Sequence, residues 1–206
     1  MLYNILATIS LILVILNLRR LIGIFPSLMA CLIRAKESIN LEASAQLSRD
    51  RDLVALLMVI PFILIAWQFR LYDPAFIGNC NEYVGLGITA GVAAAYFMIR
   101  KLLEFFLRPS RSGDKNYKTA CKTSRTFFAL LTILLIATGC LLSFIGLAPQ
   151  DIRTAMLWIS GAIYLMFIIR KTQILVSYTS FFAGFLYLCA LEIIPTGALV
   201  ASAFVF

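Results

Sequence analysis

The chain has 206 residues, of which 62% are hydrophobic and only 14% are charged, and its mean hydropathy is +0.94. Soluble domains carry about 25% charged residues, so this composition excludes a soluble globular domain, a disordered chain and a disulfide-stapled scaffold. A polytopic membrane protein remains. The formal net charge is +8, from 18 basic and 10 acidic residues, and its meaning depends on where the basic residues fall between the apolar segments.

Six apolar segments approach the length of a membrane helix, which needs roughly 17–25 residues. In chain order, these transmembrane spans are predicted at 2–18, 53–69, 83–99, 127–147, 152–169 and 174–194. A further apolar stretch, 21–33, is short and contains Pro26, so we expect an interfacial or re-entrant segment there. The predicted fold is all-α, a single membrane domain over 1–206 built as a bundle of about six spans.

The basic residues are distributed unevenly over the five connecting loops. The first, third and fifth loops hold 16 of the 18, and the second and fourth hold only Arg70 and Arg153. The positive-inside rule therefore places the odd-numbered loops in the cytoplasm and both termini outside. The two largest cytoplasmic basic loops, 34–52 and 100–126, are too short to form a soluble domain with its own core.

The loop 100–126 carries the densest positive charge. Such a loop attracts anionic lipid, by about 1 kcal/mol for each basic residue near the surface, and it also suits docking of a partner protein. Specific recognition of nucleic acid is not expected, because no folded reader module is present. The candidate residues for binding a partner or anionic lipid are Arg100, Lys101, Arg108, Arg111, Lys115, Lys118, Lys122 and Arg125.

Small residues recur every four positions in the third predicted span, at Gly87, Gly91 and Ala95. Without bulky side chains at these positions, another helix can approach closely. Packing within the bundle is the interpretation that we favour, and packing against a second copy or a partner protein is the alternative. No Lys-Ser/Thr pair follows, so these glycines do not form a phosphate-binding loop.

Pro61 lies inside the second predicted span. Proline has no backbone N–H, so it leaves a carbonyl without its helical partner and predicts a kink. Kinked helices build cavities in transporters, but they also occur in inert bundles. Pro61 is therefore a candidate functional residue with a structural alternative.

Glu192 is the one acidic residue inside a predicted span. An ionisable side chain in hydrocarbon is a candidate functional site by default. We favour a span that ends near 194, since Pro195 and Gly197 are typical of a helix end; Glu192 then lies near the outer interface. In the other register the span runs from about 177 through Pro195 to 206, and Glu192 lies near mid-membrane. A structural hydrogen bond, ion or proton coupling, and a partner contact all remain open roles.

Residues for metal or cofactor chemistry are scarce. The chain has no histidine, which removes most catalytic zinc sites and histidine-based nucleophile relays. Its cysteines form no CxxC pair, so a zinc ribbon or a redox motif is not expected. We expect no metal, no cofactor and no catalytic set. The five cysteines are Cys31, Cys80, Cys121, Cys140 and Cys189.

The segment Phe-Leu-Tyr-Leu-Cys-Ala-Leu-Glu-Ile-Ile-Pro at 185–195 resembles the closing motif of an uncharacterised family of polytopic inner-membrane proteins common in Bacteroidota. That family is filed as a domain of unknown function. The resemblance implies a location in the bacterial inner membrane and a Glu-Ile-x-Pro element from Glu192 to Pro195. It implies no activity. The chain lacks the closing basic residue that the resemblance leads us to expect.

Three functions compete at this point. The first is a non-catalytic integral subunit or scaffold of a cell-envelope complex, which fits the basic loops and the small-residue helix. The second is a small secondary transporter or channel with Glu192 and Pro61 in its pathway. The third, a membrane enzyme that acts on lipid, is disfavoured because no span holds paired carboxylates and no nucleophile has an evident base.

Overall fold

The computed structural model describes residues 2–34, 37–38, 41, 43–74, 81–107, 114–177 and 181–205. Within these ranges all regular structure is helical, as the composition predicts. The helices are α1 (Leu2–Leu16), α2 (Leu18–Ile33), α4 (Ala45–Leu57), α5 (Val59–Gln68), α6 (Glu82–Phe106), α7 (Asp114–Ile145), α8 (Pro149–Val176), α9 (Phe181–Leu188), the π-helix η2 (Cys189–Ile193) and α10 (Ile194–Val205).

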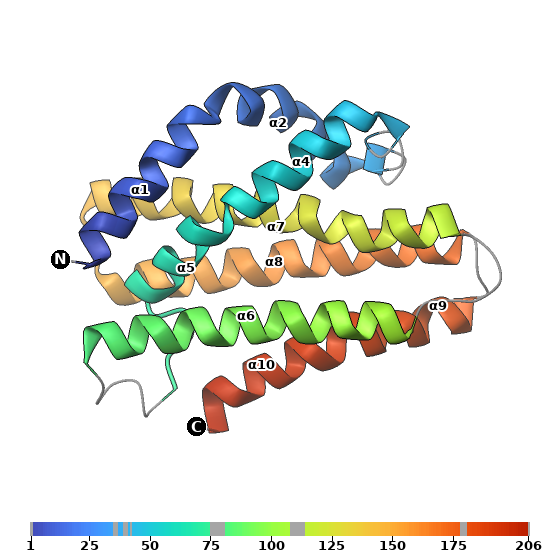
Figure 1. Ribbon diagram of the computed structural model, residues 1–206. Helices are drawn as coiled ribbons and strands as arrows, with labels where there is room; N and C mark the ends of the chain where they lie inside the picture. The colour runs from blue at the N-terminus through green and yellow to red at the C-terminus, as the bar shows by residue number, and fades with distance from the viewer. Residues whose placement is uncertain are drawn as a thin grey trace.

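The long helices lie side by side and alternate in direction along the chain (Figure 1). Helices α7 and α8 form the central antiparallel pair, and α6 lies beside the run from α9 to α10. Helices α1 and α2 form an arch that contacts α4, α5 and α7. Both termini lie at the same end of the bundle (Figure 1).

Four of the described helical segments are long and apolar enough to cross a membrane: Tyr83–Phe106, Thr119–Ile145, Pro149–Val176 and Gly184–Ala203. The pair Asn4–Leu16 and Leu18–Ile33 makes a fifth if it counts as one span, although its two parts are bent by 73°. The described residues therefore give four or five candidate spans. The chain is membrane-like in both composition and helix length, as expected.

The first predicted span, 2–18, and the apolar stretch 21–33 belong to this bent pair. Helix α1 ends at Leu16, and the side chain of Asn17 donates a 3.0 Å hydrogen bond to the carbonyl of Leu13. A side-chain donor of this kind competes with the helical backbone for its acceptors. Helix α2 then begins at Leu18 and packs Ile24 and Leu28 into the core beside α4 and α7.

The second predicted span, 53–69, is not one continuous helix. Helix α4 ends at Leu57 and α5 begins at Val59, with Met58 between them. Pro61 has no N–H to donate to the carbonyl of Leu57 four residues earlier, so the α-helical ladder is interrupted where α4 ends. Pro61 itself is buried in the first turn of α5, and neither piece alone is long enough to span a membrane.

The observed helices differ from the predicted boundary between the fifth and sixth spans. Helix α8 continues past 169 to Val176, and the last candidate span is Gly184–Ala203 rather than 174–194. The basic pair Arg170-Lys171 does not end the helix, and both side chains bind acceptors inside the fold. Pro195 and Gly197 do not end a helix either, since α10 runs from Ile194 to Val205.

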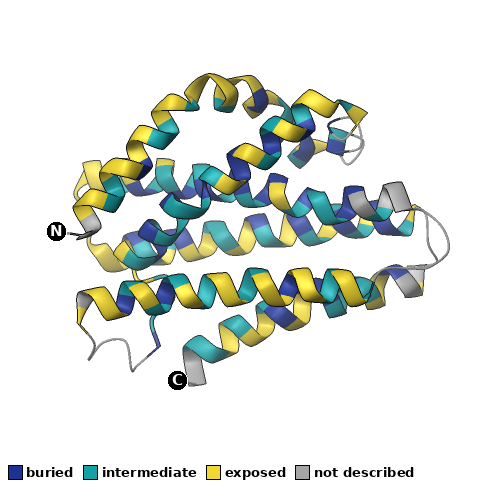
Figure 2. Cartoon of the chain, viewed as in Figure 1, coloured by how far each residue is buried: buried dark blue, intermediate teal, exposed yellow. Residues whose placement is uncertain are grey.

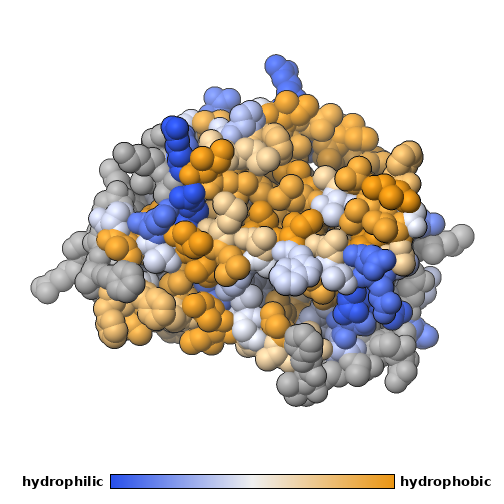
Figure 3. All heavy atoms as spheres, turned by 180° about the vertical axis from the view of Figure 1, so that it is seen from behind, coloured by the Kyte–Doolittle hydropathy of each residue, from blue (hydrophilic) through white to orange (hydrophobic). Residues whose placement is uncertain are grey.

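The small-residue positions of α6 lie on its outer face, which contradicts the expected packing within the bundle. Gly87, Gly91 and Ala95 are exposed, and a Cβ atom at either glycine would meet nothing within 4 Å. Exposed residues extend along α6, whereas buried residues are more frequent on α4, α5, α7 and α8 (Figure 2). Seen from the other side, the surface is largely hydrophobic, with hydrophilic groups gathered toward its edges (Figure 3).

Charged residues of the odd-numbered predicted loops meet at one end of the bundle. The end of α6, the start of α7 and the end of α8 lie together there (Figure 1), and they carry Arg100, Arg125 and Lys171. Arg153 pairs with Asp73 over 3.5 Å between the start of α8 and the segment after α5, at the opposite end. The ion pair of Arg153 and Asp73 therefore lies away from Arg100, Arg125 and Lys171.

Candidate functional site

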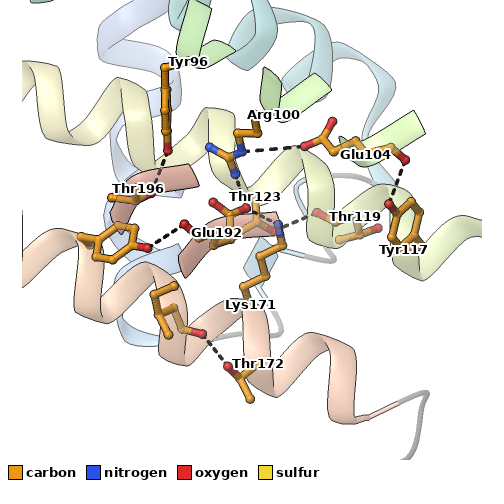
Figure 4. Close-up of polar contacts among 12 residues, drawn as sticks. Tyr96, Arg100, Glu104, Tyr117, Thr119, Thr123, Lys171, Thr172, Glu192 and Thr196 are labelled. Atoms are coloured by element: carbon orange, nitrogen blue, oxygen red, sulfur yellow. Dashed lines mark hydrogen bonds and ion pairs between the residues drawn. The ribbon is translucent and has the colours of Figure 1, made fainter. Parts of the chain in front are cut away.

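Glu192 lies inside the bundle between two basic residues of other helices (Figure 4). Its side chain is fully buried, and its Oε1 atom accepts hydrogen bonds from Arg100 Nη2 of α6 and from Lys171 Nζ of α8. Exposure of the two basic side chains is 10% and 1%. We call Arg100, Lys171 and Glu192 the charged triad.

An aromatic ring supports the two cations of the charged triad. The guanidinium carbon of Arg100 lies 5.5 Å from the centroid of Phe167, and Lys171 Nζ lies 5.6 Å from the same centroid. Aromatic faces attract cations, more strongly when water is excluded. Phe167 is itself buried, one turn before Lys171 on α8, so the ring helps to hold both charges beside Glu192.

The backbone that carries Glu192 is a π-helical turn. Ile194 donates its N–H to the carbonyl of Cys189, five residues earlier instead of four. Pro195 follows at once, and the wider turn accommodates its ring and its missing N–H. Glu192 and Leu191 are the buried residues of this turn. The proline that was expected to end the helix is therefore accommodated by a local change of helix type.

Hydroxyl groups surround the charged triad. Tyr164 of α8 donates a 3.1 Å hydrogen bond to the backbone carbonyl of Glu192, and the hydroxyl oxygens of Tyr96 and Thr196 lie 3.1 Å apart between α6 and α10. A π-turn disturbs the regular backbone ladder, and neighbouring side chains supply partners in hydrocarbon. We call α9, η2 and α10 together the last helical run. These bonds attach the last helical run to both α6 and α8.

Glu104 extends the charge network toward the basic end of the bundle. Its Oε1 lies 3.9 Å from Arg100 Nε, one helical turn along α6, and its side chain is 27% exposed. The backbone carbonyl of Glu104 accepts a 3.1 Å hydrogen bond from Tyr117. Burial raises the pKa of Tyr117 above its ordinary value, so this hydroxyl keeps its proton and remains a donor.

The charged triad is not fully satisfied by hydrogen bonds among the described residues. Both cations bind the same carboxylate oxygen, and Glu192 Oε2 and Arg100 Nε have no hydrogen-bond partner there. Two positive charges face one buried negative charge, and Glu104 is the partly exposed anion that offsets the second. Buried polar atoms without partners are unusual and mark a place that can accept a further group.

Glu192 lies inside the bundle beside Arg100 and Lys171. The register that we favoured ends the last span near 194 and predicts a position for Glu192 near the outer interface. The longer register, through Pro195, is closer to the observed helix. Sequence analysis found Glu192, Pro195 and Arg100, but it assigned Arg100 to lipid or partner binding. It did not single out Lys171, Tyr96 or Tyr164.

The other predicted candidates do not join this site. Pro61 lies in α5, while Gly87, Gly91 and Ala95 face outward on α6. Lys101 is exposed and Lys122 is half-buried. Arg108 and Arg111 lie outside the described residues, and Lys115 and Lys118 lie on α7, where their side chains are not described.

A second polar cluster joins α4 to α7. Arg125 Nη1 lies 2.5 Å from Asp52 Oδ2, and the buried Arg51 donates to Asp52 Oδ1 over 2.9 Å and 2.7 Å. Arg51 also donates to Ser48. This cluster places Arg125, a predicted lipid or partner ligand, in an ion pair within the protein.

Arg170 fastens the end of α2 to α8. Its guanidinium donates to the carbonyl of Leu32 over 3.1 Å and 2.8 Å and to that of Ile33 over 2.7 Å. Carbonyls in the last turn of a helix lack helical partners, so a charged donor there satisfies them. The neighbouring Lys171 holds Glu192, so two consecutive residues of α8 bind the bent α1–α2 pair and the last helical run.

Together, the helices and the charged triad define a class of protein: a polytopic helical membrane protein with an ionised site inside its bundle. The family comparison goes one step further. The chain belongs to the family described as Domain of unknown function (DUF4271), whose model matches residues 3–202. A search of curated proteins and a search of solved structures each return no match.

Proposed function

We propose that this chain is a non-catalytic integral subunit or scaffold of a cell-envelope complex in the bacterial inner membrane. The observation that supports this function is that α6 is covered very little by the rest of the chain. Within the apolar 18-residue stretch of α6, only 6% of the residues are buried inside the chain, against 22–28% in the other three candidate spans. A helix so little covered by its own chain has a long face available for a partner.

The small residues give that face its specificity. Gly87, Gly91 and Ala95 follow one another at four-residue intervals on the exposed side of α6. In lipid, helices associate through close backbone contact, and small residues at this spacing permit it. The occupant that we propose is a transmembrane helix of a different envelope protein, while the inner side of α6 is held by the charged triad.

The test is co-purification of native partners. The tagged chain is extracted gently from native membranes, sized, and analysed by mass spectrometry beside the variant Gly91→Leu. We expect a stoichiometric membrane partner with the wild type and at least a tenfold loss with Gly91→Leu, because about 1.4 kcal/mol of lost contact already gives that factor.

A matched control is Gly161→Leu on α8. Gly161 is also exposed and helical, and a Cβ there also meets nothing within 4 Å. This variant should keep the partner. A lone monomer or a homodimer from the wild type, or equal loss with both variants, would contradict the proposal.

The charged triad favours a second candidate, a small secondary transporter or channel with Glu192 in its pathway. Sequence analysis placed a single acidic residue, Glu192, inside a predicted span, and the structure adds two basic residues, Arg100 and Lys171, in ion pairs with it. Intramembrane charges of this kind mark ion and proton pathways in other proteins. This candidate requires flux across reconstituted vesicles that Glu192→Gln abolishes.

A further inference from the structure

We propose that Arg100 and Lys171 form a binding site for a small anion, such as a carboxylate or a halide, and that the Glu192 side chain occupies it as a tethered anion. Two cations from different helices converge on a single oxygen atom, Glu192 Oε1. Convergent cationic donors around one atom are the arrangement that binds a free anion. This inference deepens the second candidate function by naming the ligand class.

The charge balance requires an anion at this position. Arg100 and Lys171 have side chains that are 10% and 1% exposed, and the free energy of leaving two such cations without a counter-charge is strongly unfavourable. Arginine stays protonated in proteins. Glu192 therefore leaves the pair only if another anion enters, and this couples movement of the last helical run to anion binding.

The backbone provides a place for that movement. Glu192 belongs to the π-turn Cys189–Ile193, directly before Pro195. Such turns insert one extra residue into a helix, occur often at functional sites, and reorient the side chains around them when they revert to α-helix. The unpartnered Nε of Arg100 shows that the carboxylate uses only part of the donor capacity of the site, and the unpartnered Oε2 of Glu192 shows that the site does not satisfy this carboxylate fully.

Other charged and titratable groups around the triad restrict which anions fit. Glu104 lies beside Arg100 on α6, and its charge repels any anion, more strongly when the anion carries more than one negative charge. The other titratable groups on the elements that surround the triad are phenols and thiols, namely Tyr96, Tyr117, Cys121, Tyr164, Tyr187 and Cys189. The hydroxyl of Tyr96 lies 3.1 Å from that of Thr196. A small monovalent anion suits this environment best.

The experiment removes the tether and supplies the anion in solution. Purified Glu192→Ala is unfolded thermally in detergent with sodium formate, sodium chloride or sodium gluconate at equal concentration. Formate or chloride should raise the unfolding midpoint of this variant by roughly 3–6 °C over gluconate, at a concentration ten times the dissociation constant. The wild type should show no such difference, because Glu192 already fills the site.

The double variant Lys171→Met with Glu192→Ala is the matched control, since it removes one cation together with the carboxylate. Its midpoint should lose the response to formate and chloride. An equal response in the wild type or in the double variant would show a general salt effect and overturn the proposal, and so would the absence of any response in Glu192→Ala.

If Glu192→Ala does not fold in gluconate, Glu192→Ser repeats the measurement with another small side chain that leaves the position of the carboxylate open. The absence of an anion response in the variant that folds would overturn the site. The outcome is separate from transport, because unfolding requires no flux. An intact formate response without anion flux in vesicles would leave the anion site standing and remove the transporter or channel.

Discussion

The two faces of α6 carry opposite chemistry. Toward the interior lie Thr89 and Arg100, both buried, and the half-buried Tyr96, which contacts Thr196. Toward the outside lie the exposed Gly91 and Ala95. A helix repeats every 3.6 residues, so positions 89, 96 and 100 share one side, and 91 and 95 share another.

This arrangement reverses that of a helix on a water-soluble protein. In water the apolar face turns inward, but in lipid the polar groups must find partners inside the fold. The inner face of α6 is therefore specified by charges and hydroxyls, and the outer face by small apolar residues. The inner face determines how the bundle holds together, and the outer face remains for another helix.

The largest expected effect concerns the inner face. Glu192→Gln leaves Arg100 and Lys171 without their shared anion, and we expect a loss of about 3–5 kcal/mol in the free energy of unfolding. Lys171→Met leaves the pair of Arg100 and Glu192 balanced, so its effect should be smaller by at least half. Unfolding of both variants in detergent, monitored by circular dichroism, measures the difference.

The control for this prediction is Lys101→Met, since Lys101 is exposed on α6 directly after Arg100. It should change the free energy of unfolding by less than about 0.5 kcal/mol. Equal losses in Lys171→Met and Glu192→Gln would mean that charge balance does not govern the site.

Much of the architecture follows from the sequence. Apolar segment length predicts the helical fold, Pro61 predicts the interruption between α4 and α5, and the rarity of an acid in an apolar segment singles out Glu192. Each of these signals is local, because it depends on the residue and its immediate neighbours. Such signals do not depend on which helices meet.

The partners of Glu192 could not be predicted in this way. Arg100 and Lys171 follow apolar runs and resemble the basic ends of spans, as the positive-inside rule expects. Only the packing of α6, α8 and η2 turns them inward. The π-turn could not be predicted from the sequence either, because Pro195, which follows it, is equally typical of a helix end.

A change in stability of intermediate size is expected when a glycine on the outer face of α6 and a glycine in the core are each replaced by alanine. A Cβ at Gly139 of α7 would lie 2.7 Å from Met156 Cε and 3.4 Å from Phe69 Cε2, whereas one at Gly87 meets nothing within 4 Å. Alanine favours a helix over glycine by about 1 kcal/mol, but crowding opposes this gain in a packed core. We therefore expect Gly139→Ala to be less stable than Gly87→Ala by about 1–2 kcal/mol.

Thermal unfolding of the isolated chain tests this comparison, and co-purification measures whether each variant still captures a partner. Gly87→Ala should stabilise the chain alone and weaken its capture of a partner, since the added methyl group stands where a helix would approach. A variant that is stabilised and keeps its partner in full would show that this part of α6 faces lipid only.

The smallest effect lies in the hydroxyl contact between α6 and α10. Tyr96→Phe removes the 3.1 Å contact with Thr196 and keeps the ring, so we expect a loss of about 0.5–1.5 kcal/mol. Thr196→Val removes the same contact from the other side, and the double variant should lose less than the sum of the two. A double-mutant cycle of unfolding free energies measures this coupling, and strictly additive losses would mean that Tyr96 does not hold α10 to the inner face of α6.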